Sequence, residues 1–191
     1  MAWREFQYRL TSDCPLLMHN GQTADPLNKF SKAMKAISGK RKKTEADHEE
    51  LARIEFLAGL YMGKDGPVIP APMIDACIIG ASKKLREGPL AKAGFFTKAA
   101  APLEYEGPRT AEELWADERF RHTARVRVQT SSVMRTRPIF SDWSAIVTVA
   151  LEVDLVNVSQ LDGWFNVAGT QIGLGDWRPQ HGRFTAQRLT E

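Results

Sequence analysis

The alternation of apolar and polar residues after residue 142 constrains the fold of this chain more than any other feature. The apolar side chains occupy every second position, at Trp143, Ala145, Val147, Val149, Leu151 and Val153. Because successive side chains of a strand point to opposite faces, this pattern predicts a long strand with one face in the core. Residues 4–11 alternate in the same way, with Phe6, Tyr8 and Leu10 on one face. Both stretches therefore predict half-buried strands of a sheet.

Helical patterns lie between the predicted strands and set the fold class. In chain order we expect a strand at 4–11, a basic helical insertion at 20–65, a helix from Pro72, a strand around 125–137, a strand at 143–153, a helix at 159–168 and a strand at 183–189. This order predicts an α+β fold of the ferredoxin-like (RRM-like) type, an antiparallel sheet with helices on one face. We expect one domain over residues 1–191, with residues 87–120 as a connecting excursion.

Positive charge is concentrated in two blocks of a chain whose formal net charge is only +3. Residues 29–43 hold seven Lys and Arg without an acid, and residues 119–141 hold six arginines without an acid. Blocks of this kind indicate a polyanionic partner. The alternative is that each block is an ordinary solvated face, which remains open for the lysine block.

A loop from Gly169 to Phe184 carries four glycines together with Arg178, His181 and Arg183. It is much longer than the ~2–6 residues that usually join a helix to a strand. Glycines let another chain approach the backbone closely, and guanidinium groups beside free N–H groups form a seat for phosphates. The loop therefore predicts a phosphate-binding segment, and its alternative is a bend that only closes the fold.

The cysteine spacing and the short apolar runs exclude a disulfide-stabilised framework, a cysteine metal site and a membrane span. Cys14 and Cys77 lie far apart and form neither a disulfide framework nor a metal-binding spacing, which is typical of a reducing compartment. Apolar runs fall short of the ~20 residues that a membrane span needs, and the N-terminus does not resemble a signal peptide. We expect a cytoplasmic protein with no cofactor, no metal and no membrane partner.

Three patches, in the same order as in a known family, resemble the RAMP superfamily, the RNA-cradling backbone subunits of CRISPR effector complexes. They are the first strand with its exit at Tyr8–His19, the helix entry at Gly66–Lys83, and the glycine loop at Ile172–Phe184. The chain departs from the family at the helix entry, where Pro70–Met73 replace a Pro-Gly-Ser-Ser pattern, and at Lys83 and Lys84, which replace an arginine. Trp177 and Pro179 are unusual in the loop. The chain therefore resembles a small, divergent, phage-encoded relative.

The resemblance implies a ferredoxin-like core that holds RNA, or single-stranded DNA, and assembles head to tail into a filament or arc. The arginines of the predicted strand are expected to share one face, with the glycine loop as a second wall and Trp177 stacking on bases. The candidate nucleic-acid-binding residues are Arg125, Arg127, Arg135, Arg137, Lys40, Arg41, Lys42, Lys43, Lys83, Lys84, Gly173, Gly175, Trp177, Arg178, His181 and Arg183. Recognition is expected to tolerate any sequence.

Catalysis has only weak signals, so no catalytic residue is predicted. One alternative function is a RAMP-type endoribonuclease that uses Asp25 with a metal, or His181 without one. Asp25 also fits a helix N-cap, which we favour, and His181 also fits a contact with phosphate or water. A second alternative is a phage-encoded protein-interaction module that docks into a host complex.

Overall fold

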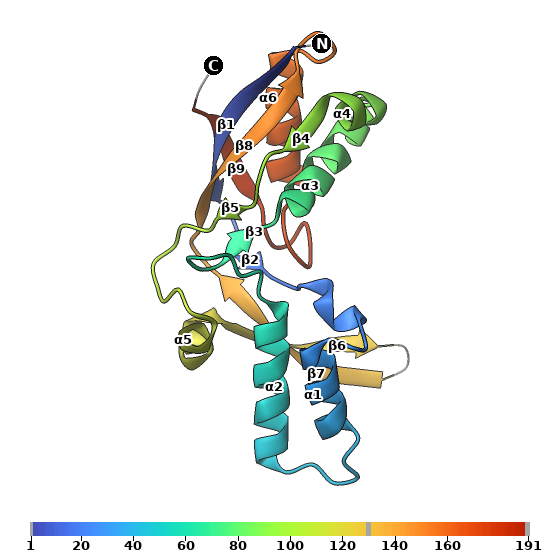
Figure 1. The fold of residues 1–191 in the computed structure, drawn as a ribbon, viewed down its shortest axis with the longest axis vertical. Helices are drawn as coiled ribbons and strands as arrows, with labels where there is room; N and C mark the ends of the chain where they lie inside the picture. The colour runs from blue at the N-terminus through green and yellow to red at the C-terminus, as the bar shows by residue number, and fades with distance from the viewer. Residues whose placement is uncertain (1, 129–130, 190–191) are drawn as a thin grey trace.

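The computed structural model describes residues 2–128 and 131–189, which form an elongated molecule with two bodies (Figure 1). One body is built on a four-stranded antiparallel sheet in the order β4-β8-β1-β9. Its strands are β1 (Trp3–Ser12), β4 (Phe95–Thr97), β8 (Ser144–Glu152) and β9 (Phe184–Arg188). The register places Tyr8 of β1 opposite Val147 of β8 and Arg188 of β9.

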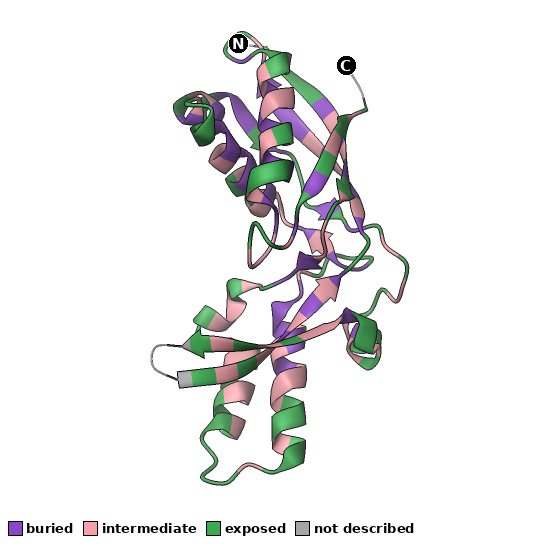
Figure 2. Cartoon of the chain, turned by 180° about the vertical axis from the view of Figure 1, so that it is seen from behind, coloured by how far each residue is buried: buried purple, intermediate pink, exposed green. Residues whose placement is uncertain are grey.

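Helices cover one face of this sheet because only that face is apolar. The inward residues Phe6, Tyr8 and Leu10 of β1 are at most 1% exposed, and α3 buries Ile74 and Ile78 against them and their neighbours. The covering helices are α3 (Ala71–Lys84), α4 (Gly88–Gly94) and α6 (Val158–Val167). We call this sheet with its three helices the sheet body, and Figure 2 shows that buried residues are concentrated in it.

The second body is built on a long β-hairpin with two helices beside it (Figure 1). Its three-stranded sheet has the order β2-β7-β6. The strands are β2 (Leu16–Leu17), β6 (Arg121–Val128) and β7 (Ser131–Phe140), and the helices are α1 (Lys29–Ser38) and α2 (Glu45–Gly59), preceded by the 3-10 turn η1 (Gly21–Ala24). We call these elements the hairpin body. Every residue of α1 is at least partly exposed, whereas α2 buries Ile54 and Phe56.

Short elements connect the two bodies. They are β3 (Val68–Ile69), β5 (Ala101–Pro102), α5 (Ala111–Ala116), η2 (Glu118–Phe120) and the π-helical turn η3 (Ala168–Ile172). The glycine loop that follows η3 runs back to β2, where the N–H of Asp176 donates to the carbonyl oxygen of Leu17 at 2.8 Å. Within the described residues, no helix is both long and apolar enough to span a membrane.

The expectation of an α+β fold with antiparallel sheets is confirmed, and the placement of one strand is corrected. The arginine-rich strand does not join the main sheet; it becomes the separate hairpin β6–β7. The edge position of the main sheet is taken by β4, a three-residue strand inside the segment 87–120 that we expected to be only a connection. A strand this short carries too few residues for its alternation to be recognised.

Helix boundaries follow the capping residues, with two corrections. The pair Thr44 and Asp47 forms a capping box at the start of α2, each side chain accepting the other's backbone N–H. Helix α1 begins after Asn28, whose side chain accepts the N–H of Phe30, and not at Asp25. Helix α6 begins after Asn157 instead of Ser159. All of these residue types cap helices well, so the sequence alone does not separate the competing positions.

Candidate nucleic-acid interface

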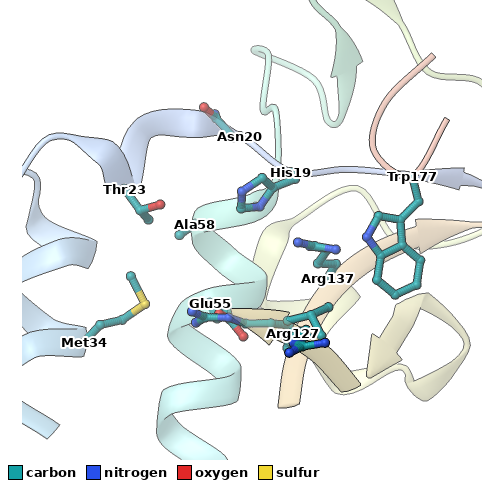
Figure 3. Close-up of a pocket in the computed structure, with 12 residues that line it drawn as sticks. His19, Asn20, Thr23, Met34, Glu55, Ala58, Arg127, Arg137 and Trp177 are labelled. Carbon is teal, nitrogen blue, oxygen red and sulfur yellow. The ribbon is translucent and has the colours of Figure 1, made fainter. Parts of the chain in front are cut away.

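A groove crosses the molecule at the junction of the two bodies. Three adjoining cavities of about 580, 550 and 440 Å³ form it. The first shares Trp177 with the second and His19 with the third, and the second and third share Arg178. We call these joined cavities the waist groove. Figure 3 shows Arg137 of β7 in the first cavity, between His19 and Trp177.

The hairpin supplies three arginines to the groove, but from both of its faces. Pairing of Ala124 with Arg135, and of Arg125 with Met134, puts even-numbered residues of β6 on the same face as odd-numbered residues of β7. The expectation that Arg125 and Arg127 share the face of Arg135 and Arg137 is therefore wrong. Arg127 still lines the first cavity with Arg135 and Arg137, whereas Arg125 donates to Ser132 Oγ at 2.9 Å.

Two carboxylates pair with two of the groove arginines, although the arginine block itself contains no acid. Arg135 Nη1 lies 2.5 Å from Glu55 Oε1 of α2, and Arg137 Nη1 lies 2.9 Å from Asp176 Oδ2 of the glycine loop. Glu55 also accepts the N–H of Thr136 at 2.9 Å. Both acids come from parts of the chain that are remote in sequence, so the absence of acids within the block does not leave these two arginines unpaired in the folded structure. Even so, four arginines against two acids leave the groove a formal charge of +2.

Trp177 is held at the centre of the groove by three side chains. The guanidinium carbon of Arg137 lies 5.3 Å from the indole centroid, and the rings of His122 and His181 lie 5.3 Å and 6.0 Å from it. The backbone of Trp177 has φ 52°, in the left-handed region that a bulky residue rarely adopts. Backbone strain of this kind is a recurrent feature of ligand sites. The half-buried indole is thus fixed where it lines two of the cavities.

His122 and His181 form a pair beside the tryptophan, with ring centroids 5.8 Å apart. Burial lowers the pKa of His122, and the nearby His181 and Arg137 lower it further. The His181 Nδ1 atom is buried and makes no hydrogen bond to the described residues. His181 is recognisable in the sequence as a histidine of the glycine loop, whereas His122 lies within the arginine strand, and only the pairing of β6 with β7 places it opposite Arg137.

The glycines of the loop pack closely against the backbone of neighbouring segments. The N–H of Gly173 is already used, since it donates to the carbonyl oxygen of Ala168 at 2.8 Å. Gly175, with φ 76°, lies so close to the carbonyl oxygen of Leu17 that a Cβ would overlap it. Gly182 approaches Leu174 in the same way. The Gly173 N–H therefore has a partner within the chain, and the close packing of Gly175 and Gly182 helps to set the path of the loop that carries Trp177 and Arg178.

The remaining basic candidates lie outside this cluster. Arg183 is exposed where β9 begins, and its carbonyl oxygen accepts the N–H groups of Asp13 and Cys14. Lys83 and Lys84 are exposed at the end of α3, where Lys84 Nζ donates to Gln171, a residue of the second cavity. The block Lys40–Lys43 forms the α1–α2 connection, at the end of the molecule farthest from both termini (Figure 1). There Lys40 pairs with Asp47 at 2.5 Å.

The metal-dependent nuclease alternative finds little support in this geometry. The Asp25 carboxylate accepts the N–H of Leu27 at 2.8 Å, which is a local turn. Among the described residues, no group of three or more His, Cys, Asp or Glu side chains is arranged to hold a metal ion. Cys14 and Cys77 are both free thiols, as expected, and burial raises the pKa of Cys77 to about 12.

The waist groove thus carries a net positive formal charge, with Trp177 in two of its cavities and two acids that pair with two of its arginines. A scan against protein-family models finds no match, and a search of curated proteins finds none either.

Proposed function

We propose that the protein binds single-stranded nucleic acid in the waist groove, with RNA as the first choice and with little sequence preference. The observation that carries this proposal is the convergence of Arg127, Arg135 and Arg137 of the hairpin with Arg178 of the glycine loop. Contacts from guanidinium groups to phosphates supply affinity without reading sequence. Trp177 adds one surface on which any base can stack.

The order of elements supports a ferredoxin-like plan and a RAMP-like relationship as part of this proposal. Leaving the hairpin body aside, β1, α3, β4, β8, α6 and β9 follow one another as strand, helix, strand, strand, helix, strand. The two strands that follow helices lie at the edges of the sheet, as that plan requires. The resemblance of three patches to RNA-cradling subunits is the reason for preferring RNA over single-stranded DNA.

A salt titration tests the proposal directly. Fluorescence anisotropy would follow the binding of labelled oligouridylate and oligodeoxythymidylate of about 20 nucleotides, with a duplex of equal length as the control. Three or four phosphate contacts predict a slope of log K against log salt of about −2 to −3 for a single strand. Affinity that is absent, or that does not change with salt, would refute the proposal.

Paired arginine substitutions locate the binding surface. Arg137→Ala combined with Arg178→Ala removes one guanidinium from each wall of the groove. The control is Arg119→Ala, because Arg119 is also paired with an acid, Asp117, but lies beside α5. The double variant should lose affinity to a similar degree for every homopolymer, and the control should not. A loss restricted to one base would contradict contacts to phosphates.

Head-to-tail assembly along the strand is the second part of the proposal. The elongated shape supports it, because the Lys40–Lys43 connection projects far from the sheet body (Figure 1) and can reach a strand held by the next subunit. Light scattering after size-exclusion chromatography, with and without oligouridylate of increasing length, would measure the mass. We expect the mass to increase with strand length. A monomeric mass at every strand length would refute head-to-tail assembly.

RNA cleavage without a metal is a second candidate function, and one observation favours it. His122 and His181 lie together beside an arginine, an arrangement that can supply a general acid and a general base. Denaturing gels of labelled RNA incubated with the wild type, His122→Ala and His181→Ala would decide the matter. Cleavage by the wild type that both variants lose would support it, and intact RNA in all lanes would exclude it.

A further inference from the structure

Glu55 occupies the position beside Arg135 that a phosphate oxygen would take. Its side chain is only 16% exposed, and its carboxylate is fixed from two sides, by Arg135 Nη1 at 2.5 Å and by the Thr136 N–H at 2.9 Å. Because Thr136 lies on β7 and Glu55 on α2, the carboxylate also joins the helix to the strand. Displacement of this carboxylate by an anion therefore costs the free energy of both contacts.

Asp176 occupies the corresponding position beside Arg137. The two side chains are 14% and 29% exposed, and their nearest atoms lie 2.9 Å apart. These two atoms are nevertheless not aligned as a hydrogen bond, and neither makes another hydrogen bond within the described part of the chain. A mostly buried ion pair with poor alignment gains little, since the cost of removing both charges from water nearly cancels their attraction. Arg137 can therefore leave Asp176 for an acceptor that is better aligned with its guanidinium group.

The ion pairs Glu55–Arg135 and Asp176–Arg137 lower the binding free energy that the groove gains from a single phosphate. Each phosphate that takes an arginine displaces a carboxylate that already neutralises that arginine, so a single contact gains little. The displaced carboxylate then remains beside the phosphate and repels it. Linked phosphates behave differently, because the first contact holds the others at a high effective concentration and their small gains add up.

On this basis, and resting on the proposed function, we infer that Glu55 and Asp176 are specificity-determining residues of the waist groove. They act as internal occupants of two phosphate positions, so that the groove accepts a polynucleotide segment and rejects mononucleotides and free phosphate.

Charge-neutralising substitutions test this inference. Glu55→Gln combined with Asp176→Asn removes both charges, keeps the side-chain shapes, and leaves an amide oxygen to accept the Thr136 N–H. The probes are adenosine 5′-monophosphate, as a competitor, and labelled oligouridylate. Asp117→Asn is the matched control, because Asp117 also pairs with an arginine and accepts a backbone N–H, but outside the groove.

We expect the double variant to bind the mononucleotide at least about tenfold more tightly than the wild type, the size of effect that removing two partly buried carboxylates allows. Oligouridylate affinity should rise by a smaller factor, so that selectivity for the polymer falls. The single variant Asp176→Asn should shift selectivity in the same direction by about threefold, and it serves as the readout if the double variant does not fold. Asp117→Asn should change neither affinity.

The outcomes separate this inference from the proposed function. If the wild type binds oligouridylate and both variants keep its selectivity against the mononucleotide, the inference is wrong and the proposed function stands. If affinity for both probes falls in the variants, the acids support the site structurally and the inference is also wrong. If neither the wild type nor the variants bind oligouridylate, both fail together.

Discussion

The sheet body and the hairpin body use similar elements and stabilise them differently. In the sheet body, the inward residues of β1 and β8 are almost fully buried under α3 and α6, and the rings of Tyr8 and Phe165 stack at 3.9 Å. In the hairpin body, every residue of α1 is partly exposed, and α2 is tied to β7 through the carboxylate of Glu55. The comparison indicates that the sheet body has the more completely buried core, whereas the hairpin body, which forms one wall of the groove, relies more on polar contacts.

Matched phenylalanine substitutions should produce the largest difference between the two bodies. Phe165→Ala removes a ring that is 1% exposed, and such core truncations cost about 3–5 kcal/mol. Phe30→Ala removes a half-buried ring of α1 and should cost about 1 kcal/mol or less. Urea unfolding of both variants gives the two values. Equal losses would show that α1 belongs to the cooperative core and would remove the distinction.

The junction between the bodies depends on the glycines of the loop. Gly182 has φ 73°, and a Cβ there would overlap the carbonyl oxygen of Leu174. Gly182→Ala should therefore cost at least about 2 kcal/mol, because the left-handed backbone and the steric overlap both oppose a side chain. Gly21→Ala is the control, since open space surrounds that position, and it should change stability by less than about 1 kcal/mol. A neutral Gly182→Ala would mean that the loop is not held against its neighbours as described.

The capping box at the start of α2 makes a local contribution to the stability of the hairpin body, and this contribution can be measured. Thr44 accepts the N–H of Asp47 at the start of α2, and Asp47 accepts the N–H of Thr44 in return. Thr44→Ala should cost about 1 kcal/mol of unfolding free energy, the usual value for losing a capping side chain. The same assay on Thr44→Ser should show little change, because serine keeps the hydroxyl. Equal losses for both variants would rule out capping as the cause.

The elements that were predictable from sequence have local causes. Alternation identifies β1 and β8 because each is long enough to repeat the pattern several times. The start of α2 is predictable because Thr44 and Asp47 are three residues apart. The three-residue strand β4 has neither property, so its role at the edge of the sheet follows only from tertiary pairing with β8.

The sequence predicts which residue types form the candidate site, but it does not predict which of them face one another. Alternation shows which side chains of one strand share a face, but the register between β6 and β7 decides that Arg125 and Arg135 do not. Glu55 is 80 residues from Arg135 in sequence, so its pairing has no local signal. The glycines were correctly identified as sites of close approach, but the approaching group is the chain's own backbone at Leu17 and Leu174.

Acid pH should weaken the junction through His122, by the smallest of these effects. Burial, followed by His181 and Arg137, lowers the pKa of His122 below its ordinary value near 6.5. Protonation therefore favours the unfolded chain: this contribution to stability is complete above the ordinary pKa and is lost as pH falls through the lowered one. His122→Asn should lose less stability than the wild type between about pH 7.5 and pH 5.5. His48→Asn, which changes an exposed histidine of α2, should retain the wild-type dependence. If His122→Asn and the wild type lose equal stability, the folded chain does not bury His122 beside His181 and Arg137 as described.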